Sequence, residues 1–284
     1  MKRRLLSAAA LAAVLTAGGP FVGTAGAQTS PPRAVDGAAT PSGDGLWVAW
    51  SNGMVDNRAA APHLGEVTGP INAPVVDIAG SVQSGTVTGP GYYLAAADGG
   101  VFTYGSASFR GSAGNLRLNR PIVGIGADTD GTGYWLAASD GGIFTYQAPF
   151  YGSAGGMRLN RPIVGFAPSL SRAGYYLVAE DGGVFTFGAA GFHGSTGGVR
   201  LNQPVVGMAT DPDGAGYWLV AADGGVFSFD AAFHGSPVGR GWIGANDRVV
   251  GIEAHPSGQG YFVITASGGA IGFGAAATVI SPPS

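Results

Sequence analysis

Short apolar runs alternate with glycine-rich turns along the whole chain, and the pattern repeats. In the clearest copy the runs are 121–125, 134–137, 143–146 and 150–152. They are rich in β-branched and aromatic residues and are bounded by Gly, Asp, Asn or Pro, which is typical of short strands. No window carries apolar residues at helical spacing over three turns. We therefore expect an all-β protein in which each repeat forms four antiparallel strands.

The period of the repeat follows from an aspartate that precedes paired glycines. It is 42 residues from Asp98 to Asp140, 41 from there to Asp181, and 42 from there to Asp223. Two worn copies, GLWVAWSNGMV and GYFVITASGGAIGFG, raise the count to six. Four strands in about 42 residues is the size of a propeller blade. We predict one six-bladed β-propeller over 32–281; an open array, or a ring completed by a partner chain, is the alternative.

The full unit has the form GY(W/Y)LxAxDGG(V/I)F(T/S)(Y/F), followed by F-x-G-S and RLN-x-P(I/V)VG. It resembles a glycine-rich propeller-type repeat of secreted actinobacterial proteins, and it is distantly similar to the repeats of quinoprotein-like and kelch-like propellers. The resemblance covers about 32–281 and implies the fold rather than a function. The sequence shows no quinone-binding pattern, so we expect no cofactor.

The first 27 residues read as a secretory signal peptide, with cations at 2–4, a short apolar run and a small-residue cleavage site at 25–27. We expect a mobile tail at 28–31 and a protein located outside the cell or in its wall.

Loss of the three leader cations would lower the formal net charge from −3 to −6. A mildly acidic, lysine-free mature chain argues against a nucleic-acid partner. No later apolar stretch is long enough for a transmembrane anchor, and the lack of cysteine excludes disulfides and thiolate metal sites.

The repeated aspartates are the first candidate ligand-binding residues: Asp98, Asp140, Asp181 and Asp223. One interpretation is a ring of carboxylates that binds a cation or a sugar. The other is a set of turn formers whose side chains accept hydrogen bonds from nearby backbone amides. Recurrence in almost every unit favours turn formation.

Three repeated arginines are the second set of candidates, and each begins an Arg-Leu-Asn sequence before the next unit: Arg117, Arg158 and Arg200. Because strand direction alternates, these links should emerge on the same face as the aspartate turns. An arginine fork there could hold a carboxylate or phosphate. The alternative is a structural Arg–Asp pair between adjacent blades.

Other polar residues give weaker signals. His193 and His234 occupy the variable position of F-x-G-S, which we expect to face solvent. Asp128 and Asp211 open sequences that resemble the start of a calcium loop, but the rest of such a loop is missing. No G-x-S-x-G or H-E-x-x-H motif occurs, and we expect no metal site.

These observations favour a secreted binding or scaffolding module of the cell envelope or extracellular space, with a cell-wall polysaccharide or an envelope protein as its partner. One alternative is a propeller hydrolase or lyase acting on sugars or esters, and another is a purely structural surface protein. An enzyme would need one non-repeated acid, base or metal cluster. The irregular segments 57–90 and 235–248 are the places for it, and neither shows a convincing set. The sequence thus leaves catalysis undecided and favours binding.

Overall fold

The computed structural model of the protein describes residues 31–82, 89–170, 173–214 and 216–280. Within these residues, eighteen strands form six sheets, and each sheet has three antiparallel strands in chain order. The predicted signal peptide and residues 28–30 of the predicted tail lie outside the described residues. The all-β propeller fold is confirmed.

The inner strands are β1 (Ala34–Ala39), β4 (Val75–Gly80), β7 (Ile122–Ala127), β10 (Ile163–Pro168), β13 (Val205–Thr210) and β16 (Val249–Ala254). The middle strands are β2 (Gly45–Trp50), β5 (Gly91–Ala96), β8 (Tyr134–Ala138), β11 (Gly174–Ala179), β14 (Tyr217–Ala221) and β17 (Gly260–Thr265). The outer strands are β3 (Val55–Ala59), β6 (Val101–Gly105), β9 (Ile143–Tyr146), β12 (Val184–Gly188), β15 (Val226–Phe229) and β18 (Ala270–Gly274), and a 3-10 helix, η1 (Ala275–Thr278), follows the last strand.

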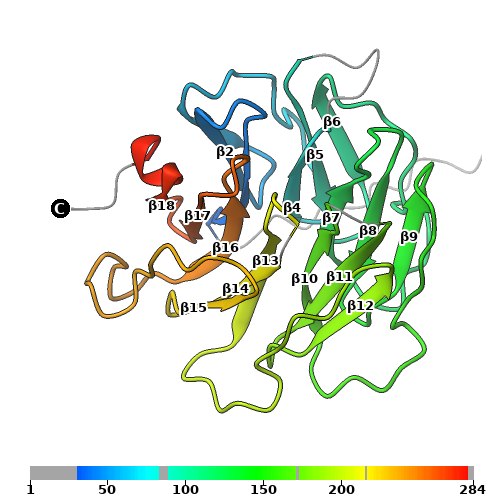
Figure 1. Cartoon of the computed structure of the whole chain (residues 1–284). Coiled ribbons are helices and arrows are strands. Elements are labelled where there is room, and N and C mark those ends of the chain that lie inside the picture. Colours follow the sequence, from blue (N-terminus) through cyan, green and yellow to red (C-terminus); the bar gives the residue numbers. More distant parts are fainter. Residues whose placement is uncertain (1–30, 83–88, 171–172, 215, 281–284) are drawn as a thin grey trace, which may run out of the picture.

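The six sheets are the blades of a closed ring (Figure 1). Each inner strand contacts the inner strands of both neighbouring blades, and β16 contacts β1. A typical seam carries a hydrogen bond from the Ile163 amide to the Ser139 carbonyl, at 2.9 Å. At the closing seam, the Ala34 amide donates to the Ala266 carbonyl at 3.0 Å. The ring therefore closes within one chain by the same bond that joins its other blades.

The prediction of a fourth strand in each blade is wrong. Segment 150–152 joins no sheet, because side chains take its hydrogen bonds. The hydroxyl of Tyr175, on the next blade, donates to the Gly152 carbonyl at 2.5 Å and accepts from the Tyr151 amide at 3.2 Å. The indole of Trp135 donates to the Pro149 carbonyl at 2.8 Å. In the last unit, the 3-10 helix η1 and a turn follow the outer strand in place of a fourth strand.

The core lies in the seams between blades, where the middle strands present an aromatic residue on each face. The first residue of the pair, such as Tyr175, points to the preceding blade, and its ring lies 5.6 Å from that of Trp135. Both side chains are buried, and burying one such ring contributes roughly 1.5–3 kcal/mol. A single blade would expose both faces, so it could not be stable alone.

Every inner strand also carries a β-bulge at the same position. In β10, for example, the pairing register shifts between Ile163 and Gly165, which leaves Val164 unpaired. A bulge of this kind re-aims a side chain. The bulged residue is a valine in all six blades, and together these valines line an axial cavity of about 220 Å³: Val35, Val76, Val123, Val164, Val206 and Val250.

The tyrosine bond across the seam can be tested with Tyr175→Phe. The change keeps the ring but removes the partner of one amide and one carbonyl, so the free energy of unfolding should fall by about 1–3 kcal/mol. Urea denaturation measures this. Tyr176→Phe is the matched control, because Tyr176 is buried in the same strand and its hydroxyl makes no hydrogen bond within the described residues. Equal losses in both variants would contradict the assignment.

Candidate functional site

The predicted aspartates form turns. The Asp140 carboxylate accepts a hydrogen bond from the Gly142 amide at 3.0 Å, and the intervening Gly141 has a φ of +82°. The same bond closes the turns at Asp98, Asp181 and Asp223. One oxygen of each carboxylate is thus occupied by the backbone, as the turn-forming interpretation requires.

The predicted arginines are exposed. None of Arg117, Arg158 and Arg200 forms an ion pair or hydrogen bond with another described residue, so the expected structural Arg–Asp pair is not observed. The segments that carry these arginines lie against the aspartate turns of their own blades, as the Ala154 amide shows by donating to the Gly141 carbonyl at 2.9 Å. We call this surface the link face and define it by the turns at 98–100, 140–142, 181–183 and 223–225 and the links at 114–120, 155–161 and 197–203.

The link face is hollowed between blades. Two grooves, of about 450 and 340 Å³, occupy equivalent positions one blade apart. Each presents an arginine, the turn aspartate, an apolar residue, a leucine and an asparagine: Arg120, Asp140, Met157, Leu159 and Asn160 in one, and Arg161, Asp181, Val199, Leu201 and Asn202 in the other. Arg161 also lines the first groove.

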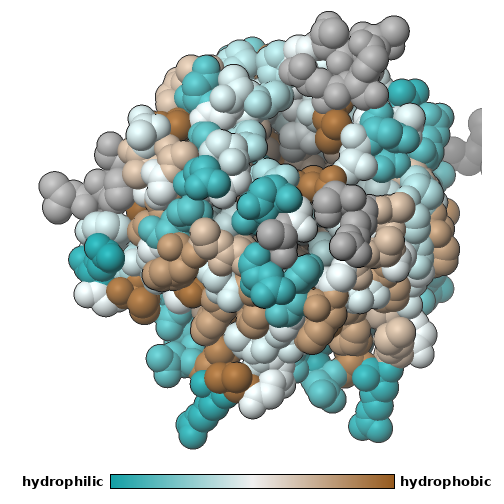
Figure 2. Space-filling model, viewed as in Figure 1, coloured by the Kyte–Doolittle hydropathy of each residue, from teal (hydrophilic) through white to brown (hydrophobic). Residues whose placement is uncertain are grey.

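The arginines of the grooves are therefore Arg120 and Arg161, which our sequence analysis missed. They stand in Asn-Arg-Pro, three residues after the arginines that we predicted. Their repetition was visible in the sequence, but only the structure shows which arginine faces a hollow. In the view of Figure 2, hydrophilic side chains project from the lower rim beside hydrophobic ones, over loops that are green and yellow in Figure 1. The grooves thus combine cationic, anionic, amide and apolar surface.

A second polar feature lies inside the ring and does not repeat. Where four blades have glycine after the bulged valine, the first two have Asp36 and Asp77. Asp77 is 8% exposed; its carboxylate accepts from the Ile78 amide at 2.8 Å and from the Ile125 amide, on the next blade, at 2.7 Å. The carboxylate of Glu253, on the last blade, accepts from the Ala39 amide at 3.0 Å.

Burial favours the protonated form of these carboxyl groups. Burial, together with the charge of Asp77, raises the pKa of Asp36 well above its ordinary value, and the two side chains hydrogen-bond to each other. Burial raises the pKa of Asp77 to about 7, against the opposing effect of its hydrogen bonds. Burial likewise raises the pKa of Glu253 to about 7. Both oxygens of Asp77 accept hydrogen bonds from amides. The proton in the hydrogen bond between the two carboxyl groups, which we call the shared proton, is therefore carried by Asp36. These residues were not predicted from the sequence, in which they look like ordinary departures from the repeat.

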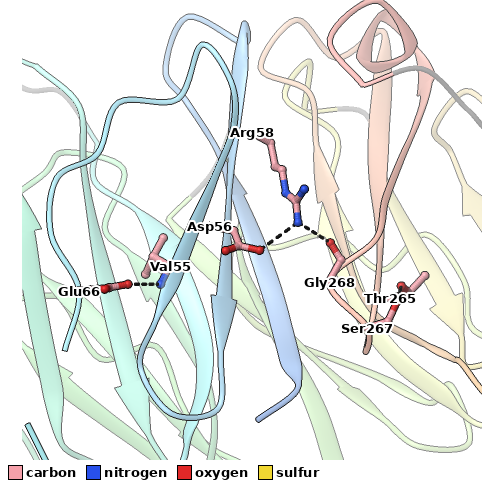
Figure 3. Close-up of polar contacts among 7 residues, drawn as sticks. All are labelled: Val55, Asp56, Arg58, Glu66, Thr265, Ser267 and Gly268. Carbon is pink, nitrogen blue, oxygen red and sulfur yellow. Dashed lines mark hydrogen bonds and ion pairs between the residues drawn. The ribbon is translucent and has the colours of Figure 1, made fainter. Parts of the chain in front are cut away.

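The first blade differs from the others in its outer part, within the segment that we identified as irregular. The Arg58 guanidinium binds the Asp56 carboxylate at 2.9 Å and donates to the Gly268 carbonyl, on the last blade, at 3.1 Å (Figure 3). The Glu66 carboxylate accepts from the Val55 amide at 3.1 Å. These contacts tie the first blade to the last and hold the chain that follows β3.

The variable position of F-x-G-S is not solvent-facing as predicted. His193 and His234 are half-buried, since each packs at the seam with the next blade. His193 binds Asp230 at 2.8 Å, and His234 lies beside Trp218. In the described part of the chain, no three His, Asp or Glu side chains gather as metal ligands.

The calcium-like sequences form hairpin turns between inner and middle strands. Asp128 and Asp211 are buried at the start of their turns, and each amide donates across the hairpin, to Gly133 and Gly216 respectively. Turn formation, the interpretation that the incomplete motif favours, accounts for these contacts.

Comparison with known proteins shows the fold alone. No protein-family model matches the chain, and no curated protein matches it. Among solved structures, it is similar to a structural-genomics protein of unknown function from Bacteroides thetaiotaomicron, with a TM-score of 0.53 and 15% identity, over 84% of this chain and 68% of the other. Among the described residues, no helix is long and apolar enough to cross a membrane.

The axial carboxyl groups predict a pH-dependent stability. Their folded pKa values exceed the ordinary ones, so the folded state binds more protons than the unfolded chain between about pH 4 and pH 7. The free energy of unfolding should therefore fall as the pH rises across this range, by roughly 1.4 kcal/mol for each unit by which a carboxyl pKa is raised. Urea denaturation at pH 4.5 and pH 8 measures the difference.

Asp36→Asn isolates the shared proton, because an amide can accept from the Gly37 amide and donate to Asp77 without titrating. This variant should lose much of the pH dependence and be more stable than the parent at pH 8. Asp98→Asn, which preserves a turn bond, is the control for the loss of one charge. A pH dependence that Asp36→Asn leaves intact would refute the interpretation.

Proposed function

We propose that the protein is a secreted binding module of the cell envelope or extracellular space, and that its link face binds a cell-wall polysaccharide. The observation that carries the proposal is the recurrence of one groove, with the same five kinds of side chain, in successive blades. A repeated site suits a ligand with a repeated unit, since several weak contacts then act together.

The chemistry of each groove suits a glycan. Arginine and asparagine offer hydrogen-bond donors, and the aspartate and the asparagine carbonyl offer acceptors. The methionine or valine and the leucine provide the apolar surface against which the C–H face of a sugar can rest. Both grooves contain cationic and anionic side chains, so they favour a hydroxyl-rich polymer over a strongly charged one.

Secretion is part of the proposal and is supported by the leader sequence at 1–27. Membership of the glycine-rich actinobacterial repeat family is likewise proposed, on the repeat motif alone. The arginines at the outer part of the links, Arg117, Arg158 and Arg200, would add long-range attraction for acidic groups on the polymer, because they are exposed and unpaired among the described residues.

Two other partners or functions have some support. An envelope protein could bind the same face, which carries exposed apolar residues such as Leu116, Met157 and Val199. A hydrolase is favoured by one observation, the proton-sharing pair Asp36 and Asp77 in the axial cavity. Loss of an ester or glycoside hydrolysis activity in Asp36→Asn, with wall binding unchanged, would support the hydrolase.

Retention on isolated cell-wall polysaccharide tests the proposed function. The double variant Arg120→Gln/Arg161→Gln should be retained at least about tenfold more weakly than the parent, which corresponds to about 1.4 kcal/mol. Arg117→Gln/Arg158→Gln/Arg200→Gln should show a smaller loss that grows at low salt.

Arg110→Gln is the matched control, because Arg110 carries the same charge and lines neither groove. Melting temperatures establish that each variant is folded. If the parent is not retained, or if all arginine variants weaken retention equally, the grooves are not the binding site.

A further inference from the structure

A third hollow lies at the equivalent position of the last blade and differs from the two grooves. Its volume is about 760 Å³, against 450 and 340 Å³. It is bordered by the link 237–248, which belongs to one of the two irregular segments of the sequence. Here Asp247 stands where the other links have Arg120 or Arg161, and Ser267 stands where the other turns have aspartate. We call this hollow the Trp242 cavity, after the indole in its wall.

Trp242 is presented to the cavity in a fixed orientation. The Arg240 guanidinium lies 4.9 Å from the centre of its ring, and the Phe273 ring lies 6.0 Å away. Its side chain is half-buried, and its indole N–H has no partner within the described residues. By contrast, the indoles of Trp135 and Trp218 are buried and donate to backbone carbonyls at 2.8 Å. Trp242 thus has both apolar surface and a free donor to offer a ligand.

The rest of the cavity lining is polar, and hydrogen bonds hold part of it in place. The Asp247 carboxylate accepts from the Ser267 hydroxyl at 2.6 Å, from the Ser267 amide at 3.1 Å and from the Arg248 amide at 2.8 Å. Partial burial opposes its ionisation, but hydrogen bonds from Ser267, Thr265 and Arg248 outweigh that effect and lower its pKa. The ionised carboxylate therefore fixes the hydroxyls of Ser267 and Thr265, while the exposed amide of Asn246 is free to donate and accept.

We propose that the Trp242 cavity is a saccharide-binding subsite that takes one or two uncharged sugar rings. An aromatic surface in one hollow with hydroxyl, carboxylate and amide groups matches a ring whose face is C–H and whose edge is hydroxyl. The volume falls in the range typical of small-molecule sites. The carboxylate in the wall disfavours an anionic ligand, and the polar lining disfavours an apolar one. The inference rests on the proposed function, since it makes this subsite the one that selects the sugar of the polymer.

Titration with soluble disaccharides tests the subsite, with cellobiose, chitobiose and maltose as the probes. At least one should bind the parent saturably in isothermal titration calorimetry, a measurement that does not depend on the indole of Trp242 and can be repeated on every variant. Asn246→Ala and Trp242→Ala should each weaken that binding at least tenfold. Asn119→Ala, at the corresponding position of an earlier link, is the matched control and should bind like the parent. Asn246 is exposed and makes no hydrogen bond within the described residues, so its loss should not affect folding even if Trp242→Ala does.

The outcomes separate this inference from the proposed function. Disaccharide binding that survives both substitutions overturns the subsite. Polysaccharide retention that depends on Arg120 and Arg161, with no disaccharide bound, also overturns the subsite but leaves the proposed function standing. Disaccharide binding lost in Asn246→Ala and kept in Asn119→Ala supports the subsite, even if the polysaccharide is not retained through the grooves.

Discussion

A tyrosine hydroxyl that crosses five of the six seams is the contact on which the blade structure depends. It donates to a glycine carbonyl of the preceding blade in five seams: Tyr92 to Gly65, Tyr134 to Gly111, Tyr175 to Gly152, Tyr217 to Gly194 and Tyr261 to Gly235. The bond satisfies backbone polar groups in the segment that follows each of these outer strands. That segment therefore does not need to pair with a strand. The carbonyl belongs to a glycine because the backbone there has a positive φ and lies close to an aromatic ring. Gly152 has a φ of +132°, and a Cβ there would lie 2.6 Å from the Phe187 ring.

The closing seam lacks this tyrosine and uses other contacts. Its middle strand has Leu46 at the corresponding position, which packs with Ala276 of η1. Asp36 lies so close to the preceding inner strand that a Cβ on Gly251 would be 2.0 Å from its carboxylate. The shared proton of Asp36 and Asp77 and the bond from Ala39 to Glu253 therefore join the first blade to both neighbours. The carboxyl groups thus add side-chain contacts at both seams of the first blade, and at the closing seam the Ala39–Glu253 bond takes the place of the tyrosine bond.

The sequence predicted the parts of the fold that depend on periodicity. Three strands in each blade, the six copies and the turns at Asp98 and its equivalents follow from apolar runs and turn residues that recur every 41 or 42 positions. The fourth strand was predicted wrongly because run 150–152 has strand composition, and composition does not show that Tyr175 and Trp135 take its hydrogen bonds. Of the candidate site, the face was predictable but the groove residues were not. Arg117 recurs in three links and Arg120 in two, and packing rather than recurrence shows which of them lines a hollow.

Residues that depart from the repeat can therefore be interpreted by comparison with the regular blades. Because five seams share the same tyrosine bond, a polar residue found at one seam alone needs a separate cause. For Asp36 and Asp77 that cause is the joining of blades inside the ring, since their oxygens are bound by backbone amides and by each other. The Trp242 ring packs against Phe273 at the last seam, but its indole N–H and the side-chain amide of Asn246 have no partner in the described chain. Equivalent grooves would increase the affinity of the protein for a polymer, but they would not make it selective for one kind of sugar. The Trp242 cavity is a place where selectivity can arise, since its lining differs in chemistry from that of the two equivalent grooves.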